Sequence, residues 1–536
     1  MTIRCYNRLS ETTIRENGFG NVKGSNFQCT EVSPASSKTF DVDGKSMTKL
    51  SCPFTWDMGK IMEIRVRLLN DKSRFEDVTD TQDQFPEFVL IYHLMLAYEN
   101  VSNENPQAAI ECIKGAENSF LEIKQRKTLE SVERVLKHIL FGTKYYVLQQ
   151  MGQLTQADEL LKEICNIKDM NETELAMLSG CQCLAWSLYN VTDNSMAIKF
   201  AQEAVQHEPS NGKWHFLVGK NCRTLRKRNC STDSLPDEHE SFGFQKAYEL
   251  SKNALFGVYL ARMYRESKNT EEANRMYKQV AAGERTCCKV QLQLALGLVR
   301  AKDCSLAKSC LDYVAERMPD SPKYAHYMAI YEEKCNRDFK AALRYYTTAI
   351  EEGNFQAEWQ YIECRKKVEP DWNPLPYMLE LLTKYNKDPD AQIQEINIKI
   401  GVYYLFHMDD VLSASPYLDN AVQIDPNAKS LKTYFVSYQN NVNVYYAWAV
   451  KIRLALLMEA TKLSTDKKAM LKDKLQLCSE NDQISSSISG DSEQTLNQLW
   501  SEMYQNYHNQ SSGGNSRQQQ INRRNYSEGT RQPKHL

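Results

Sequence analysis

Residues 210–229 carry six basic side chains and no acidic one, although the whole chain of 536 residues has a formal net charge of only −2. Lysine and arginine side chains bind anions, and phosphate groups above all, through charge and hydrogen bonds. Because the chain as a whole is nearly neutral, we expect any anionic partner to meet a local patch rather than the overall charge. The basic residues of this stretch are Lys213, Lys220, Arg223, Arg226, Lys227 and Arg228.

The sequence offers no comparable signal for catalysis or metal binding. The nine histidines are scattered, and the chain contains no Gly-rich phosphate loop, no HExxH and no GxSxG. The cysteines form no CxxC, and neither Cys181/Cys183 nor Cys287/Cys288 is followed by a second pair at zinc-ribbon spacing. We therefore expect a protein that is not an enzyme, with no catalytic residues, no cofactor and no metal ion.

Composition and the N-terminal residues predict where the protein works. A hydrophobic content of 42% and a charged content of 25% are typical of a soluble folded chain. Residues 1–17 lack the apolar segment of a secretory signal, and no apolar run reaches the length of a membrane span. We expect a cytoplasmic protein with no membrane partner, whose cysteines are reduced and packed in its core.

An internal repeat supplies the elements that must position the basic residues. In successive segments a small or aromatic residue of a first helix is followed twelve positions later by an alanine that opens a second helix. This spacing is typical of the tetratricopeptide repeat, a helix–turn–helix of about 34 residues in which the two helices approach closely at small side chains. The pairs are Ala97/Ala109, Tyr145/Ala157, Ala185/Ala197, Ala261/Ala273 and Ala295/Ala307.

The repeat predicts an all-α fold, a tetratricopeptide-repeat superhelical solenoid without strands and with disordered N- and C-terminal extensions. The solenoid is expected over residues 48–460, with about eight or nine repeats and an inserted loop near 229–241. Residues 1–47 show no sustained period and are interpreted as an irregular extension. Residues 479–536, rich in Ser, Gln, Asn and Arg, are predicted to be a low-complexity, basic and disordered tail.

Resemblance to tetratricopeptide proteins implies that the first helix of each pair lines a concave groove. The residue after the small one then points into the groove, and at this position three aromatic residues precede two cations. Arg226, Lys227 and Arg228 are predicted to lie on a loop past the helix end, where the helix dipole accounts for them. Lys220 and Arg223 are predicted to face the groove without a counter-charge, which indicates an anionic ligand. The five positions after the small residues are Tyr98, Tyr146, Trp186, Lys220 and Arg262.

Aromatic rings beside cations on a concave surface are typical of single-stranded nucleic-acid binding, because bases stack on rings while phosphates meet Lys and Arg. The same rings also suit packing between helices, and the same groove suits a peptide or a partner helix. Two functions therefore stay open: an effector that binds single-stranded RNA, and a protein–protein interaction scaffold that binds a peptide or a partner helix in the groove. Protein partners and a homo-oligomer are expected with either function. The predicted RNA-binding residues are Lys220, Arg223, Arg262, Trp186, Tyr146, Tyr259, Gln293 and Lys213.

Several segments resemble the interferon-induced proteins with tetratricopeptide repeats. The most specific is "CPFTW", residues 52–56, which precedes the first repeat. It is joined by "HLMLAYENV" in the first repeat, "GCQCLAWSLYN" in the third, and the Tyr264-Arg265 pair in the fifth. The resemblance spans roughly residues 48–430 and implies a cytoplasmic, non-enzymatic effector of antiviral defence, of a family in which some members hold the 5′ end of foreign single-stranded RNA and others are scaffolds.

The family's RNA-binding positions are only partly kept in this sequence. The third-repeat Trp and Lys of the family align with Leu184 and Leu188, and its fourth-repeat Arg aligns with Thr224. The fifth-repeat groove Tyr matches Tyr259 and the sixth-repeat Gln matches Gln293. The resemblance therefore implies a groove that binds RNA, while recognition of a 5′-triphosphate or a cap does not carry over residue by residue.

Overall fold

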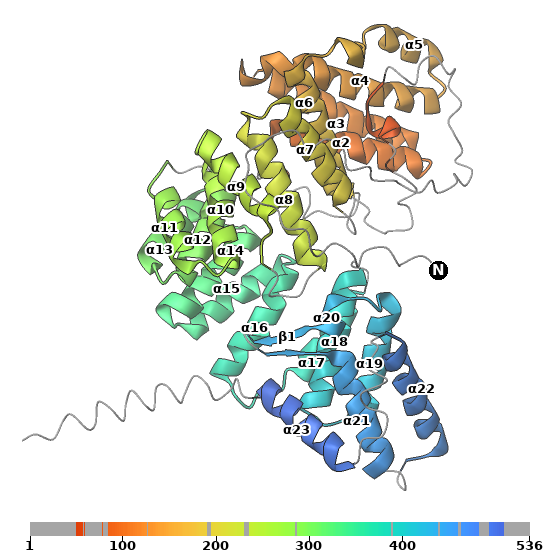
Figure 1. Cartoon of the computed structure of the whole chain (residues 1–536), viewed down its shortest axis with the longest axis vertical. Helices are drawn as coiled ribbons and strands as arrows, with labels where there is room; N and C mark the ends of the chain where they lie inside the picture. Colours follow the sequence, from red (N-terminus) through yellow and green to blue (C-terminus); the bar gives the residue numbers. More distant parts are fainter. Residues whose placement is uncertain are drawn as a thin grey trace, which may run out of the picture. The chain divides into compact units, whose positions relative to one another are not determined.

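The structure is a computed structural model, and its helices follow one another in pairs along the chain (Figure 1). It describes residues 50–56, 58, 78, 84–125, 127–189, 194–229, 235–284, 287–386, 390–437, 440–458, 463–481 and 493–508. The predicted N-terminal extension, residues 1–47, lies outside the described residues. All described residues belong to one unit of the chain, Lys49–Leu536.

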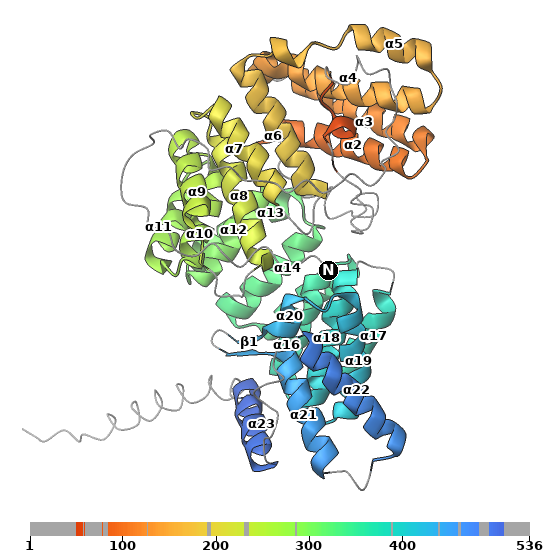
Figure 2. The same cartoon turned by 45° about the vertical axis from the view of Figure 1, so that its right-hand side comes forward.

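Each pair joins two helices that are consecutive in the sequence and pack against each other, as predicted for a tetratricopeptide array (Figures 1 and 2). Many second helices begin at an Asn or Asp whose side chain accepts a hydrogen bond from the first turn, as Asn105, Asn269 and Asp303 do. The pairs of the first half are α2 (Pro86–Ser102) with α3 (Pro106–Lys124), α4 (Glu133–Gln150) with α5 (Leu154–Lys162), α6 (Glu172–Tyr189) with α7 (Ser195–His207), α8 (Gly212–Asn229) with α9 (Glu238–Ser251), and α10 (Ala254–Glu266) with α11 (Thr270–Ala281).

The second half continues in the same way and then changes. Short helical turns also occur outside these helices, among them η1 (Pro53–Thr55), η4 (Lys127–Val132), η5 (Ile167–Asp169) and the π-helix η6 (Glu332–Asn336). The elements of the second half are α12 (Cys288–Arg300) with α13 (Cys304–Arg317), α14 (Pro322–Tyr331) with α15 (Phe339–Glu351), α16 (Phe355–Val368), which packs on α15, α17 (Leu375–Lys384), which packs on α18, α18 (Asp390–Phe406) with α19 (Val411–Ile424), then α20 (Lys429–Lys432), β1 (Tyr434–Ser437), β2 (Asn440–Val442), α21 (Val444–Met458), α22 (Thr465–Asn481) and α23 (Glu493–His508).

The small residues of the repeat stand where the sequence predicted close helix contacts. Ala185 and Ala197 are 0% and 1% exposed, and the other alanines of the predicted pairs are equally buried. In the pair of α8 and α9 two glycines take this place: a Cβ added to Gly243 would lie 2.8 Å from the backbone nitrogen of Gly219. The predicted register, and with it the all-α tetratricopeptide fold, is confirmed.

The inserted loop is shorter than predicted. Helix α8 runs to Asn229, and α9 already begins at Glu238, because the Asp237 side chain accepts a hydrogen bond from the backbone nitrogen of Glu240 at 2.7 Å. The predicted boundary of the insertion, residue 241, therefore lies inside a helix.

The expectation of an array without strands is wrong at one place. Between α20 and α21 the chain forms an antiparallel hairpin of β1 and β2, in which Tyr434 pairs with Val442. This segment is rich in Tyr, Phe and Val, which favour strands, and it is anchored by Val442 and Val444, both buried.

Helical structure also extends beyond residue 479, where the tail was predicted to begin. Helix α22 extends to Asn481, and α23 lies within the segment expected to be disordered. Its Leu496 and Trp500, four residues apart, are buried on the same helix face, and the Trp500 ring stacks on Phe406 with centroids 5.0 Å apart. Two large apolar side chains in an otherwise polar sequence thus give α23 an apolar face, which packs against the rest of the protein. Residues 509–536 lie outside the described part of the chain.

Hydrogen bonds hold the segment "CPFTW" and the residue before it against the second repeat. The backbone nitrogen of Ser51 donates a hydrogen bond to His138 Nε2 at 3.0 Å, and Trp56 Nε1 donates to the Ser51 hydroxyl at 2.7 Å. The other ring nitrogen of His138, Nδ1, donates to the Cys165 carbonyl at 2.9 Å, which leaves Nε2 as the acceptor in the neutral ring. Burial lowers the pKa of His138, so the neutral form that this contact needs is favoured.

The expectation that all cysteines are reduced is also wrong at one place, because Cys304 and Cys335 form a disulfide. Their Cα atoms lie 5.8 Å apart, which is a normal separation for such a bond. The other described cysteines are thiols, and most are buried, as predicted. Burial raises the pKa of the Cys52 thiol to about 12, so such core thiols are inert.

The buried contact of α6 with α7 leaves no room for a larger side chain at position 197. We expect Ala197→Leu to lower the free energy of unfolding by ~1–3 kcal/mol, because the added atoms force the two helices apart. Urea unfolding followed by circular dichroism measures this, with Gln202→Leu, at an exposed position of the same helix, as the matched control. Equal stability of the two variants would show that the register is wrong.

Stability should also fall in mild acid through His138. The pKa of His138 is below its usual value in the folded protein, so the unfolded chain binds the proton first as pH falls below about 6.5. This contribution is complete above the unfolded pKa and is lost as pH falls through the folded pKa. Melting temperatures measured from pH 7.5 to 5 should therefore decrease, and the decrease should be smaller for His138→Gln, which offers an uncharged donor and acceptor. An unchanged pH slope in that variant would contradict the assignment.

Candidate nucleic-acid interface

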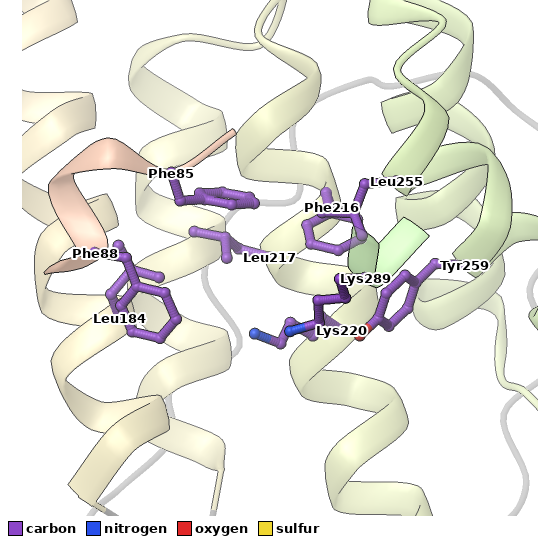
Figure 3. A pocket seen from close by; sticks show the side chains of 9 residues that line it. All are labelled: Phe85, Phe88, Leu184, Phe216, Leu217, Lys220, Leu255, Tyr259 and Lys289. Atoms are coloured by element: carbon purple, nitrogen blue, oxygen red, sulfur yellow. The ribbon is translucent and has the colours of Figure 1, made fainter. Parts of the chain in front are cut away.

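A pocket lies among the first helices of successive pairs, where α6, α8, α10 and α12 meet the start of α2 (Figure 3). It encloses about 290 Å³, counting the part that is open to solvent. Apolar and aromatic side chains form most of its wall, and two lysines supply its charge. The lining residues are Phe85, Phe88, Leu184, Phe216, Leu217, Lys220, Leu255, Tyr259 and Lys289.

Helical spacing explains why these residues meet. On α8, Phe216 and Lys220 are four residues apart and so share one face, as do Leu255 and Tyr259 on α10. The rings fix one another: Phe216 stacks on Phe256 with centroids 4.5 Å apart and meets the edge of Tyr259 at 5.0 Å. The aromatic wall is therefore rigid, because its members pack against buried neighbours.

The positive charge of the pocket is concentrated at one place. Figure 3 shows the amino groups of Lys220 and Lys289 pointing into the same opening, beside the hydroxyl of Tyr259. Burial by itself raises the pKa of Tyr259, but the nearby cations Lys220, Lys289, Arg262 and Arg223 outweigh it, so that its pKa is below the usual value. A partly buried tyrosine that is made more acidic by nearby cations indicates a positive potential, and such a potential favours an anionic ligand.

The prediction that Arg223 faces the groove without a counter-charge is wrong. Glu266, the last residue of α10, accepts a hydrogen bond from Arg223 Nη2 at 2.6 Å and one from Arg226 Nη2 at 2.6 Å. Arg262 Nε lies 3.4 Å from the same carboxylate, and Lys227 Nζ lies 3.6 Å from it. Sequence reasoning missed Glu266, although it follows Arg262 by four residues, a spacing that suits an ion pair on a helix.

This network sets the charge of Glu266. Burial raises the pKa of the Glu266 carboxyl, but the hydrogen bonds and charges of Arg223 and Arg226 outweigh it and hold that pKa at about 2. One carboxylate is thus shared by several cations. The nearby cations still lower the pKa of Tyr259, although Glu266 pairs with two of them, Arg223 and Arg262.

Arg226 was predicted on a loop, accounted for by the helix dipole, and this too is wrong. It lies in the last turns of α8, is 7% exposed, and forms two hydrogen bonds to Glu240 of α9, at 2.7 and 2.8 Å. Glu240 is fully buried. Arg226 therefore closes a buried ion pair between α8 and α9 and is not available to a ligand.

Lys213 also has a counter-charge. Its Nζ lies 2.9 Å from Glu87 Oε1 on α2 and 5.4 Å from the ring centroid of Phe85. Because Glu87 belongs to the first repeat and Lys213 to the fourth, this ion pair ties the start of α2 to α8. Lys213 thus helps to hold one wall of the pocket in place and does not point into it as predicted.

Two aromatic residues predicted to stack on bases are covered by the protein itself. Tyr146 is 4% exposed and stacks on Phe54 of the "CPFTW" segment, with centroids 5.1 Å apart; burial raises its pKa to about 12. Trp186 is 6% exposed and packs in the main core, where its Nε1 has no hydrogen-bond partner. Neither ring offers a face to a ligand in this structure.

Tyr259 and Lys220 line the pocket, whereas Gln293 lies further along α12 and donates a hydrogen bond to the Tyr327 hydroxyl at 3.1 Å. Phe85 and Phe88, from the first repeat, were missed, and no local sequence signal marks them as neighbours of α8. Lys220 Nζ lies 5.5 Å from the ring centroid of Phe88, a cation–π distance. The structure thus brings together Lys220, Tyr259 and Lys289, and separates Tyr146 and Trp186 from them.

Two further observations concern the rest of the described chain. No group of three or more His, Cys, Asp and Glu side chains in it is placed to hold a metal ion. None of its helices is long and apolar enough to cross a membrane.

No known family's sequence profile matches the chain. Solved structures nevertheless share its fold. The human IFIT1 dimer with m7Gppp-AAAA aligns at a TM-score of 0.53 and 14% identity, over 83% of this chain and 99% of that one. A monomeric IFIT1 mutant with Gppp-AAAA gives 0.53 at 14% identity, over 86% and 98%. The human IFIT1 dimer with PPP-AAAA gives 0.50 at 14% identity, over 83% and 99%.

At this identity the likeness shows the fold. It confirms the distant resemblance suggested by "CPFTW" and the repeat pattern: this chain has the tetratricopeptide architecture found in IFIT1, over most of the length of both proteins.

The buried ion pair between Arg226 and Glu240 gives a stability prediction. Arg226→Met should lower the free energy of unfolding by ~3–5 kcal/mol, because it leaves the fully buried Glu240 carboxylate without its partner. Lys227→Met is the matched control, since Lys227 is one-third exposed and should cost less than about 1 kcal/mol. Urea unfolding of both variants measures the difference, and equal stabilities would show that the ion pair is not formed.

Proposed function

We propose that this chain is a non-enzymatic tetratricopeptide-repeat protein that binds single-stranded RNA at the pocket between α2, α6, α8, α10 and α12. The observation that carries the proposal is the convergence of the Lys220 and Lys289 amino groups on one opening in an aromatic wall, beside Tyr259 (Figure 3). Phosphate groups suit the two amino groups, and a base suits the partly exposed ring of Tyr259, which is the combination that single-stranded nucleic acid offers.

Two lines of support join this geometry. The pKa of Tyr259 is lowered by four cations, so the opening has the positive potential that a phosphate needs. The IFIT1 structures with the same fold contain RNA, PPP-AAAA in one of them. From that likeness we also propose that the protein acts in the cytoplasm, in defence against foreign RNA, and that it associates with copies of itself or with other proteins.

A peptide scaffold is the competing function, because peptide carboxylates also suit two lysines. The two functions differ in their response to salt. Single-stranded RNA releases counterions when phosphates are neutralised, so the logarithm of its affinity falls steeply with the logarithm of salt concentration, by about 0.7 per phosphate contact. Docking of a peptide depends much less on salt.

The test is fluorescence anisotropy of a labelled oligoadenylate with the purified full chain over a series of salt concentrations. Lys220→Gln with Lys289→Gln should weaken binding and reduce the salt slope by about 1.4, because two phosphate contacts are lost. Lys114→Gln, at an exposed lysine of α3, is the matched control and should change neither. Arg223 is left unchanged, because it belongs to the network of Glu266 and its replacement would disturb the fold.

A third variant separates stacking from charge. Tyr259→Leu should weaken binding without changing the salt slope, since it removes a partly buried ring of the pocket and no cation. Melting temperatures of all variants must match the wild type. If the wild type binds no oligoadenylate at low salt, or if the double lysine variant binds as well as the wild type, RNA binding at this pocket is refuted and the scaffold function is favoured.

A further inference from the structure

The disulfide between Cys304 and Cys335 joins two consecutive repeats. Cys304 is the first residue of α13, directly after the turn that ends α12, and Cys335 lies in the π-helix η6 that ends α14. The bond therefore links the α12–α13 turn to the far end of α14, across 31 residues of sequence. In a repeat array, where neighbouring units are held mainly by packing, such a bond is an additional tie.

Packing also holds this junction together. Helix α14 packs on both α12 and α13, and side chains such as Leu311, Val314 and Met328 are buried there. The two bonded cysteines, by contrast, are only partly buried, so that a small thiol reaches them from solvent. Most other described cysteines are buried thiols. The bonded pair is set apart by its position, since Cys112, Cys165, Cys287 and Cys288 are also partly buried.

Local structure also favours exchange at Cys304. Cys304 is the first residue of α13, where the helix dipole stabilises a thiolate, although the backbone N–H of Leu306 in this turn is already bonded to the Asp303 side chain. A stabilised thiolate is both a better leaving group when the bond is reduced and a larger reactive fraction when it forms. Cys335 stands in a π-helical turn, a local widening of the helix that recurs at functional positions.

We propose that Cys304 and Cys335 form a thiol–disulfide exchange site that reversibly cross-links the repeats of α12–α13 and α14–α15, with a glutathione-type disulfide as oxidant. The Cys304 thiolate attacks the oxidised glutathione, whose S–S bond breaks and releases one glutathione thiolate. The Cys335 thiolate then attacks the Cys304 sulfur and displaces the second glutathione. Two protein thiols lose two protons and two electrons, and one glutathione disulfide becomes two thiols.

The cross-link has a structural consequence for the inner helices. Gln293 of α12 donates a hydrogen bond to Tyr327 of α14, so these helices are also joined along their length. In the oxidised form the ends of α12 and α14 cannot separate; in the reduced form only packing and this hydrogen bond hold them. The proposal does not depend on RNA binding, because the site lies outside the pocket.

The experiment titrates the purified full chain with mixtures of reduced and oxidised glutathione, quenches with acid, alkylates free thiols and identifies the Cys304 and Cys335 peptides by mass spectrometry. We expect the bridged fraction to pass from nearly none to nearly all within the range of the mixtures. Hydrogen exchange of the amides of residues 301–305 and 332–338 should become ~10–100-fold faster on reduction, because the tie no longer restrains the opened state.

Variants make the result specific. Cys304→Ser should show the fast amide hydrogen exchange at every glutathione ratio. Cys112→Ser, at a partly buried cysteine of α3, should respond to the glutathione ratio as the wild type does. A bridge that survives excess reductant in the folded protein would overturn the proposal, since the bond would then be permanent. The proposal would also be overturned if both thiols stayed free in excess oxidised glutathione, or if a glutathione adduct formed that Cys335 never displaced. Amide hydrogen exchange that did not change on reduction would overturn it too.

Discussion

The close contact between small residues of paired helices is the constraint on which the rest of this structure depends. Where Ala185 meets Ala197, and where Gly219 meets Gly243, the helix axes approach more closely than larger side chains allow. Each such contact fixes a second helix against its first, and so places the next first helix alongside. Residues on α8, α10 and α12, separated by thirty residues or more, thereby come to line one pocket.

The second constraint on the structure is the charge of the basic side chains on α8 and α10. Many cations gather at the C-terminal ends of α8 and α10, where the helix dipole favours them. The carboxylates Glu240 and Glu266 neutralise enough of this charge to allow its burial, and they tie the same helices together. The cations that remain closer to Tyr259 still leave a positive potential there. Two residues of one basic stretch thus have different roles: Arg226 stabilises the contact between α8 and α9, and Lys220 lines the pocket.

The start of the chain's first repeat completes the site from a distance. Phe85, directly before α2, and Phe88, within α2, contact α8, and the ion pair of Glu87 with Lys213 holds them there. The segment before them, with Phe54, covers Tyr146 and removes it from any groove. Phe85 and Phe88 therefore form part of the pocket wall, although the repeat pattern did not predict them there. Phe54, in turn, covers Tyr146, which the repeat pattern did predict to face a ligand.

The sequence by itself determined the class of fold, the register of the helix pairs and the place of the basic stretch. The helical period and the spacing of small residues depend on residues that are close in the sequence. They can therefore be read without knowing which other helices pack against the segment. Only the tertiary structure decided which cations are neutralised, which rings are buried and which cysteines bond. Glu266 reaches Arg223 across 43 residues, Phe54 reaches Tyr146 from another repeat, and Cys304 reaches Cys335 across 31. Coulomb energy, burial and covalent reach depend on distance in space, and a sequence alone does not state the distance between residues of different repeats.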